Sequence, residues 1–280
     1  MAWGRLPPAM NRRVVITGIG MLTSLAGTAP ATWAALLEGR SGVRALERAD
    51  VRGPFTDEAF AGLRCRVGAP VRDRDCGGAL MNDPVGTDDT AGPSPYCDPE
   101  LRSSQGRRRH PAFVRFALSA ATEALSDAVA GALGHLPPND HAAAVELARR
   151  AIAVGAGGGP GAFGVPPERF GVALGAGLGS AADLVAVGAN LAAGRLRRVS
   201  PYLVPSVLPN MPAGHASLAF GLRGPCLAPA TACAAGAHAV GDAFEIVRTG
   251  RADVMLWRVS VHARGVMESA IPHVCLFFSI

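Results

Sequence analysis

The stretch Pro229-Ala230-Thr231-Ala232-Cys233-Ala234-Ala235-Gly236 places one cysteine among small residues. Residues 224–228, just before it, read as a short strand. The residues after it carry small and apolar side chains at three- and four-residue spacing: Ala237, Val240, Gly241, Phe244 and Val247. That spacing is typical of an amphipathic helix. We therefore predict a strand, a tight turn and a helix, with Cys233 on the turn.

A cysteine at the start of a helix can be reactive. The first turn of a helix carries a partial positive charge and unbonded N–H groups. These favour the thiolate, which is the nucleophilic form of cysteine. Ala232 and Ala234 leave space for a substrate above the sulfur. The pattern indicates an acyl-accepting nucleophile. Local context alone leaves open a second interpretation, in which the cysteine is buried and only fills the core.

Further motifs follow the same order as in a known family. They are 13–21 (RVVITGIGM), 33–42 (WAALLEGRSG), 170–179 (FGVALGAGLG), 200–205 (SPYLVP), 210–215 (NMPAGH), 221–225 (GLRGP), 237–244 (AHAVGDAF) and 250–255 (GRADVM). With the cysteine segment, this set resembles the β-ketoacyl-ACP synthases of the thiolase-like superfamily. The order is most similar to the FabF-like synthases, and the stretch before and after His238 to the mitochondrial member.

The resemblance implies a fold and a set of roles. The fold would be α/β, the N-terminal half of the thiolase-like fold, with a mixed sheet and helices on its faces. Cys233 would carry the acyl group, and its own backbone N–H would form half of an oxyanion hole. Leu178 and Met211 would line the acyl pocket, although Leu178 can also be read as ordinary core. The implied partners are acyl carrier protein, acyl and malonyl thioesters, and a second copy joined through about 224–231.

The resemblance also divides the chain. It predicts a ketoacyl synthase domain over 11–255, with loop insertions at 76–110 and 154–168, and a divergent tail over 256–280. The second lobe of the family, which carries a histidine pair and a lysine, is expected to be absent. All 27 basic residues are arginine. His262 and His273 lie in the tail without the family context. We therefore expect a truncated synthase that accepts an acyl group and does not condense alone.

Two other functions stay open on the sequence. One is a non-catalytic isoform that pairs with a full-length synthase. The other is a cysteine-dependent acyl-thioester hydrolase, which would need a histidine base. His215 and His238 are the candidates by proximity in sequence, and we expect both to be structural. His238 follows Cys233 by five positions along the helix, which predicts that the His238 side chain points away from the turn.

No cofactor or metal is expected from the sequence. Gly18-Ile19-Gly20 follows a strand, but Thr23 stands where a dinucleotide-binding motif has its third glycine. The six cysteines lack Cys-x-x-Cys spacing, so neither a zinc site nor a disulfide framework is predicted. The net charge of +5 suits an acidic partner or reflects an arginine-biased composition. The basic clusters 107–109 and 195–198 lack interleaved aromatics, which argues against nucleic-acid binding.

Localisation and solubility follow from the resemblance and the composition. Residues 1–10 are too short for a transit peptide to be assigned, and no apolar run reaches membrane-spanning length. The resemblance implies a mitochondrial protein, and otherwise a cytoplasmic one. A single lobe would expose an apolar face, which predicts aggregation or dependence on a partner. Expected strands cover 12–24 and 171–175, expected helices cover 30–39, 111–133, 141–153 and 180–194, and expected loops cover 76–110 and 200–212.

Overall fold

The computed structural model describes residues 12–50, 56–71, 96, 106, 109–133, 165–260 and 273–279. The expected helix 141–153 and His262 lie outside the described residues. So do most of the two expected insertions, 76–110 and 154–168.

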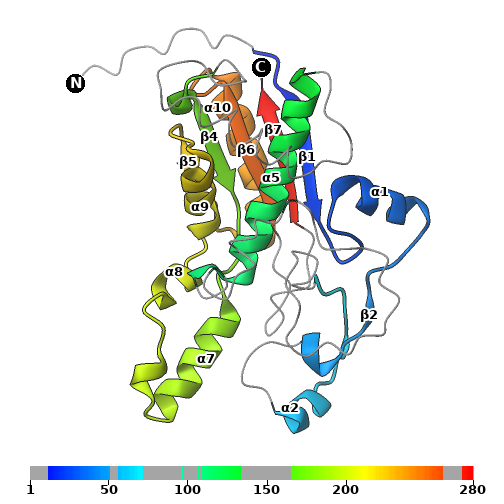
Figure 1. Cartoon of the computed structure of the whole chain (residues 1–280), viewed down its shortest axis with the longest axis vertical. Coiled ribbons are helices and arrows are strands. Elements are labelled where there is room, and N and C mark those ends of the chain that lie inside the picture. The colour runs from blue at the N-terminus through cyan, green and yellow to red at the C-terminus, as the bar shows by residue number, and fades with distance from the viewer. Residues whose placement is uncertain are drawn as a thin grey trace.

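A five-stranded mixed sheet forms the centre of the described part (Figure 1). Its strands, in spatial order, are β1 (Val15–Leu22), β7 (His273–Ser279), β6 (Val254–Ser260), β4 (Phe170–Leu174) and β5 (Cys226–Leu227). β4 is parallel to both β5 and β6, whereas β7 is antiparallel to β6 and to β1. The expectation of a mixed sheet is confirmed.

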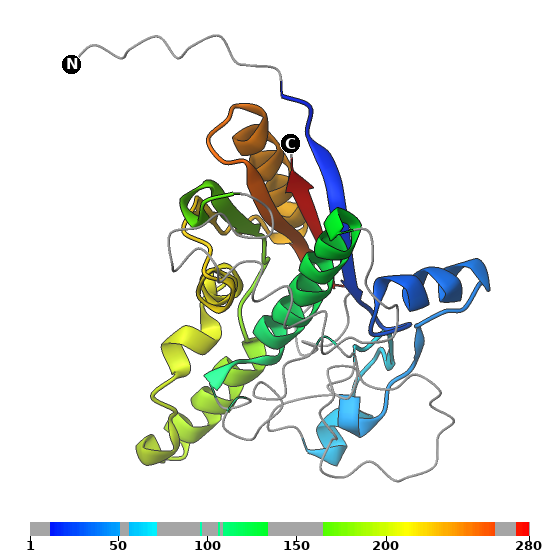
Figure 2. The ribbon, with the colours of Figure 1, turned by 45° about the horizontal axis from the view of Figure 1, so that its top comes forward.

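Helices cover both faces of this sheet. α5 (Ala112–Leu133) and α9 (Met211–Phe220) pack on one face, and α10 (Ala235–Arg248) packs on the other (Figure 2). Because side chains alternate along a strand, Val172 and Leu174 of β4 join the core beneath α5 and α9. Ala173, between them, joins the core beneath α10. The strand is buried on both faces, as its apolar sequence requires.

β1 lies directly on the backbone of α5. A Cβ atom on Gly18 or Gly20 would overlap a carbonyl oxygen of the helix, at Ala124 or Ala120 respectively. Only glycine permits this approach. The predicted strand 12–24 and helix 111–133 are thereby confirmed, and the glycines of the Gly-x-Gly pattern serve strand–helix packing.

The remaining elements surround this core. They are α1 (Ala29–Leu37), β2 (Arg44–Ala45), η1 (Arg48–Asp50), α2 (Asp57–Ala61), β3 (Val67–Gly68), η4 (Pro167–Arg169), α7 (Ala181–Ala192), η5 (Leu196–Arg198) and α8 (Leu203–Val207). The expected loop over 200–212 is wrong, because α8 lies within it and α9 begins at its end. Pro205 and Pro212 occupy first turns, where a missing N–H costs nothing. Both prolines are therefore compatible with helix starts.

The tail after residue 255 is part of the sheet. Residues 256–260 continue β6, which pairs with β4 from Phe170 to Leu174. Residues 273–279 form β7, which pairs with β6 on one edge and β1 on the other. The sequence of β7, HVCLFFS, is a short apolar run that suits a strand with neighbours on both sides. Residues predicted to form a divergent tail thus supply part of β6 and the whole of β7.

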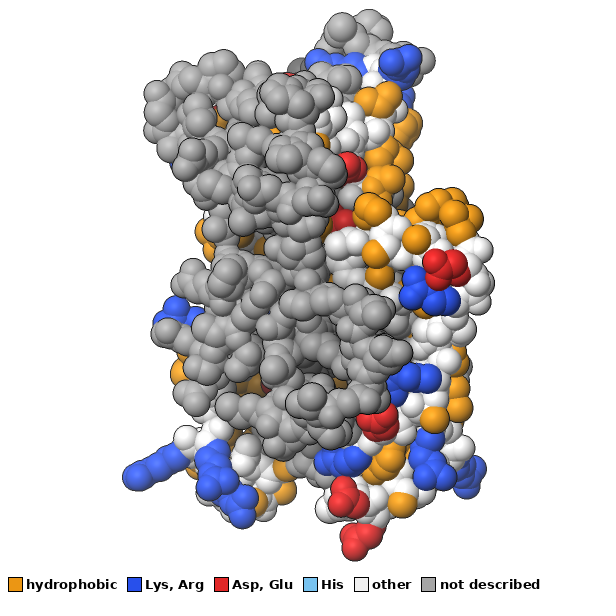
Figure 3. Space-filling model, turned by 45° about the vertical axis from the view of Figure 1, so that its right-hand side comes forward, with side chains coloured by type: hydrophobic (Ala, Val, Ile, Leu, Met, Phe, Trp, Pro, Cys, Tyr) orange, Lys and Arg blue, Asp and Glu red, His pale blue; other side chains and the backbone are white. Residues whose placement is uncertain are grey.

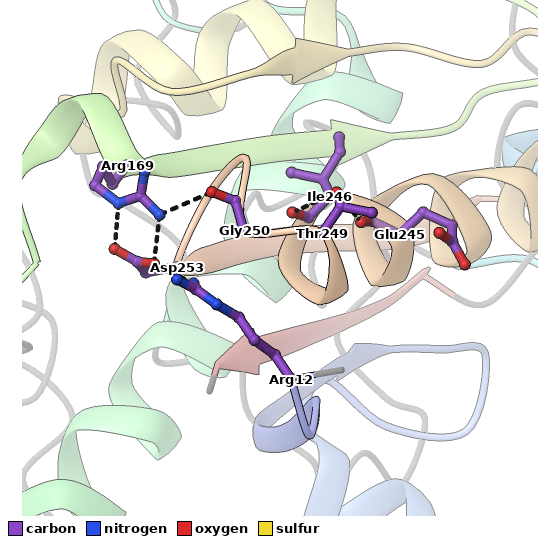
Figure 4. A network of polar contacts seen from close by, with 7 residues as sticks. All are labelled: Arg12, Arg169, Glu245, Ile246, Thr249, Gly250 and Asp253. Atoms are coloured by element: carbon purple, nitrogen blue, oxygen red, sulfur yellow. Dashed lines mark hydrogen bonds and ion pairs between the residues drawn. The ribbon is translucent and has the colours of Figure 1, made fainter. Parts of the chain in front are cut away.

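A polar clasp joins the starts of three segments that run in the same direction (Figure 4). Asp253, just before β6, accepts a hydrogen bond from Arg12 Nη1 at 2.7 Å. Arg169, at the start of β4, binds the same carboxylate through Nε and Nη2. Arg169 Nη2 also donates to the Gly250 carbonyl at 3.0 Å. The hydrogen bond from Arg169 is the largest influence holding the pKa of Asp253 below its usual range. This clasp sits at the amino ends of β4 and β6.

Glu123 of α5 is a buried carboxyl group with two backbone donors. It accepts hydrogen bonds from the N–H of Met21 at 2.8 Å and of Ala29 at 2.7 Å. These bonds favour the carboxylate, and burial opposes them. Burial is the larger effect and raises the pKa of Glu123 from its ordinary value of 4.5 to about 8. The charge of Asp127, one helical turn away, contributes to this rise in the pKa.

This shift predicts a pH-dependent stability. The folded chain holds the Glu123 proton to higher pH than the unfolded chain does. The stabilising contribution is therefore fully present below pH 4.5 and is lost as the pH rises through about 8. Urea unfolding of wild type and Glu123→Gln, from pH 5 to 9, measures it. We expect the free energy of unfolding of wild type, relative to that of Glu123→Gln, to fall by up to about 1.4 kcal/mol for each unit by which the pH rises in this window. A constant difference between the two proteins would contradict the raised pKa.

Apolar side chains remain exposed along β1 and α1 (Figure 3). Trp33 is 62% exposed and Leu37 is 71% exposed, and both belong to α1. Ile16 and Ile19 of β1 are also exposed. Soluble proteins seldom leave neighbouring large apolar side chains uncovered without an interaction that uses them.

Candidate functional site

The candidate site lies beyond the carboxyl ends of the neighbouring strands β4 and β5. Because these strands are parallel, the segments that follow them emerge side by side. Residues 175–179 follow β4, and residues 228–234 follow β5 and lead into α10. Such edges, beyond the carboxyl ends of parallel strands, are where α/β proteins bind ligands. The polar clasp lies at the opposite end of α10, which spans about 21 Å over its 14 residues.

Cys233 lies in the short 3-10 turn η6 (Ala232–Ala234), directly before the first residue of α10. The predicted strand–turn–helix arrangement is confirmed. The side chain is exposed, so the interpretation of a buried, core-filling cysteine is wrong. Within the described part of the chain, no group accepts a hydrogen bond from the Cys233 amide. The sulfur and an available N–H donor therefore stand together at a helix start.

The turn that presents Cys233 has an unusual backbone. Ala232 has a φ of +51°, and no other described non-glycine residue has a positive φ. A side chain in this region costs about 1–3 kcal/mol, which the surrounding structure must offset. Ala234 N donates to the Thr231 carbonyl at 3.1 Å and closes the turn.

His238 also contacts this turn. Its Nδ1 lies 2.7 Å from Thr231 Oγ1, within hydrogen-bonding distance. The expectation that His238 points away from the turn is therefore wrong. Side chains on an α-helix lean toward its N-terminus, so a residue in the first turns of α10 can reach back over the segment that precedes the helix. The number of residues between His238 and Cys233 did not reveal this.

A glycine-rich segment supports the turn from behind. A Cβ atom on Gly175 would overlap the carbonyl oxygen of Ala235, and one on Gly177 would lie 3.1 Å from the Ala232 Cα. Gly179 is packed in the same way against Val207 of α8. Sequence reasoning recognised the motif at 170–179 without assigning it this role. The glycines at 175, 177 and 179 alternate along the segment and leave one of its sides without side chains. This alternation could have predicted the close packing against the turn.

The predicted pocket residues occupy different environments. Leu178 is 49% exposed within the glycine-rich segment, so it is not ordinary core. Met211 is the first residue of α9 and is partly buried against the core beneath α5 and α9. Their role in an acyl pocket stays a prediction.

His215 of α9 packs against another histidine. Its ring meets that of His110 edge-to-face, with 4.5 Å between the ring centroids. Burial, and then the nearby His110, hold the pKa of His215 below its usual value. Among the described residues, no group of three His, Cys, Asp or Glu side chains is arranged to hold a metal ion. No described helix has the length and apolarity to cross a bilayer.

Comparison with known proteins identifies the family. A family model described as "Beta-ketoacyl synthase, N-terminal domain" matches residues 11–83 and 139–260. The chain belongs to this family of condensing enzymes. It is 33% identical over 251 residues to the mitochondrial 3-oxoacyl-[acyl-carrier-protein] synthase of Arabidopsis thaliana, covering 88% of this chain and 44% of that protein. It is 32% identical over 247 residues to 3-oxoacyl-[acyl-carrier-protein] synthase 2 of Vibrio harveyi, covering 88% of this chain and 45% of that protein.

Solved structures show the same fold. A β-ketoacyl synthase from Burkholderia phymatum superimposes with a TM-score of 0.60 at 21% identity, over 95% of this chain and 59% of that one. A ketosynthase solved in complex with its acyl-carrier protein gives a TM-score of 0.56 at 17% identity, over 96% of this chain and 64% of that one. The chain therefore has the ketosynthase fold, and it spans about half the length of the curated relatives it matches.

Proposed function

We propose that this chain is the nucleophile-bearing half of a 3-oxoacyl-ACP synthase of fatty acid biosynthesis, with Cys233 as the acyl acceptor. The observation that carries the proposal is the exposed sulfur of Cys233 at the start of α10, beside a backbone N–H that donates to no group among the described residues. The thiolate attacks the carbonyl carbon of an acyl thioester and forms a new C–S bond. The original C–S bond breaks, and the leaving thiolate takes up a proton.

The same geometry supports half of an oxyanion hole. Negative charge develops on the thioester oxygen during attack, and a donor aimed at it lowers the barrier. The Cys233 amide is such a donor. The second half of the family reaction, decarboxylation of malonyl-ACP, needs further groups that stabilise an enolate. In the family these include a lysine, and this chain contains no lysine. We propose that the chain alone stops at the acyl-enzyme.

The partners follow from the same proposal. Acyl carrier protein is acidic and delivers the acyl group, and the net charge of +5 complements it. β5 forms one edge of the five-stranded sheet, which leaves residues 224–231 accessible to a second copy. The exposed apolar side chains of α1 and β1 support dependence on a further protein surface. The Arabidopsis relative is mitochondrial, and we propose the same location here.

Intact-mass spectrometry of the purified chain tests this function. The chain is incubated with an acyl-ACP, with and without malonyl-ACP. We expect one acyl group per chain, mapped to Cys233 by peptide analysis, and no 3-oxoacyl product. Formation of 3-oxoacyl-ACP would show a complete condensing enzyme. Steady release of free acid would show a hydrolase. Absence of any adduct would favour a non-catalytic partner of a full-length synthase.

A further inference from the structure

We infer that Thr231 and His238 form a positioning pair that holds the turn of Cys233 in its reactive conformation. The inference rests on the proposed function, because it concerns the same sulfur. It adds a role for two residues whose side chains hydrogen-bond to each other beside the turn.

The turn of Cys233 needs support from its surroundings. Ala232 adopts a φ of +51°, directly before Cys233. A non-glycine residue leaves this region unless its surroundings hold it there. Gly177 packs against the Ala232 backbone from one side, because a Cβ atom added to Gly177 would lie 3.1 Å from the Ala232 Cα. The backbone N–H of Ala234 donates to the Thr231 carbonyl and that of Ala235 donates to the Ala232 carbonyl, so both bonds lie within the turn or at its junction with α10.

Thr231 and His238 supply a connection between the turn and α10. Thr231 Oγ1 and His238 Nδ1 are 2.7 Å apart and seven residues apart along the chain. Thr231 belongs to the turn, and His238 belongs to the rigid helix α10. Their hydrogen bond therefore spans the strained residue and Cys233 together. Because the pair fixes the turn relative to the helix, it also fixes the sulfur and the Cys233 amide relative to the helix start.

Neither side chain of the pair has a large role in the core. Each is exposed, so neither contributes much buried area. An exposed histidine on a helix is easily replaced unless its ring has a specific partner. Here the ring nitrogen nearest the turn is engaged by a hydroxyl, which assigns the pair to orientation of the turn.

Alkylation of Cys233 by iodoacetamide measures this role directly. The rate is followed by tandem mass spectrometry that assigns the alkylated sulfur, because Cys226 and Cys233 lie on the same stretch, 224–248, between two arginines. Loss of a single hydrogen bond lowers the fraction of molecules in which the turn has its reactive conformation only moderately. We expect His238→Ala and Thr231→Val each to slow alkylation between about two- and tenfold. The double variant should be no slower than either single variant, because both remove the same bond.

Conservative variants separate positioning from general stability. His238→Asn places an amide where Nδ1 stood, and Thr231→Ser keeps the hydroxyl. Both should restore alkylation to within about twofold of wild type. Glu245→Gln, exposed on the same helix far from the turn, should leave the rate unchanged. Thermal unfolding midpoints are measured alongside, and the alkylation rates should follow the hydrogen bond and not the midpoints.

The outcomes distinguish this inference from the proposed function. Unchanged alkylation in both His238→Ala and Thr231→Val would overturn the positioning role, even with normal acyl transfer. Alkylation of His238→Asn as slow as that of His238→Ala would overturn it too. Conversely, a wild-type chain that forms no acyl adduct, but whose alkylation depends on the pair, would overturn the proposed function alone.

Discussion

Replacing Cys233 by alanine is expected to reduce acyl transfer to the chain by at least about a thousandfold, because no other group can take over the nucleophile's role. The side chain is exposed and its neighbours are small. Loss of the sulfur should therefore change the free energy of unfolding by less than about 0.5 kcal/mol. Acyl adduct formation by intact mass and urea unfolding measure the two effects.

Cys226→Ala is the matched control for this experiment. Cys226 lies in β5, on the strand that leads to the same turn, and is also partly solvent-exposed. Despite that exposure, desolvation by surrounding protein raises the pKa of its thiol. A thiol kept protonated is a poor nucleophile. The Cys226→Ala variant should therefore acylate like wild type. If the adduct instead persists in Cys233→Ala and disappears in Cys226→Ala, the nucleophile has been misassigned.

Gly175→Ala is expected to destabilise the chain by about 3 kcal/mol and to slow alkylation of Cys233. The added Cβ would overlap the carbonyl oxygen of Ala235, the first residue of α10. The nearest atoms all belong to the backbone of Ala235 and Gly236, so no flexible side chain can move aside. Relief requires the glycine-rich segment to separate from the helix start, which removes the support behind Cys233. Urea unfolding and the alkylation assay report the two consequences.

Gly241→Ala provides the opposite case within the same region. Gly241 lies inside α10, and a Cβ atom there would meet nothing within 4 Å. Alanine is a better helix former than glycine, so this change should stabilise the chain by about 0.5–1 kcal/mol. Equal stabilities for the two variants would show that Gly175 does not contact the helix start as described.

Local patterns in the sequence were reliable where neighbouring residues decide the structure. The helix predicted after Cys233 corresponds to α10, and the strand predicted over 171–175 corresponds to β4. The predicted apolar face of that helix is wrong, because Ala237, Gly241 and Phe244 are exposed and the buried residues are Ala235, Gly236, Ala239, Ala243, Ile246 and Val247. The pattern over 111–133 predicted α5 nearly to the residue. The prediction of a loop over 200–212 is wrong, because Pro205 and Pro212 each lie in the first turn of a helix. A proline signals a helix start as readily as a loop, and its neighbours in the sequence do not separate the two.

Long-range pairing was not readable from the chain. β7 lies between β1 and β6, and its register with β1 joins residues more than 250 positions apart. The Asp253 clasp likewise binds Arg12, which is 241 residues away. Hydrophobic periodicity describes a residue's own element and carries no information on which distant element completes it. The sequence therefore predicts only a divergent tail, whereas the structure places part of that tail at the centre of the sheet.

The amino-acid sequence alone was enough to place a cysteine on a turn between a strand and a helix, because the patterns that predict strands, turns and helices each extend over about ten residues. They were also enough to show the family resemblance. Only the folded molecule decided that the sulfur is exposed, that Gly175 and Gly177 press on its turn, and that His238 leans back to Thr231. Those features depend on the packing of backbones and on side-chain direction, which no local pattern records.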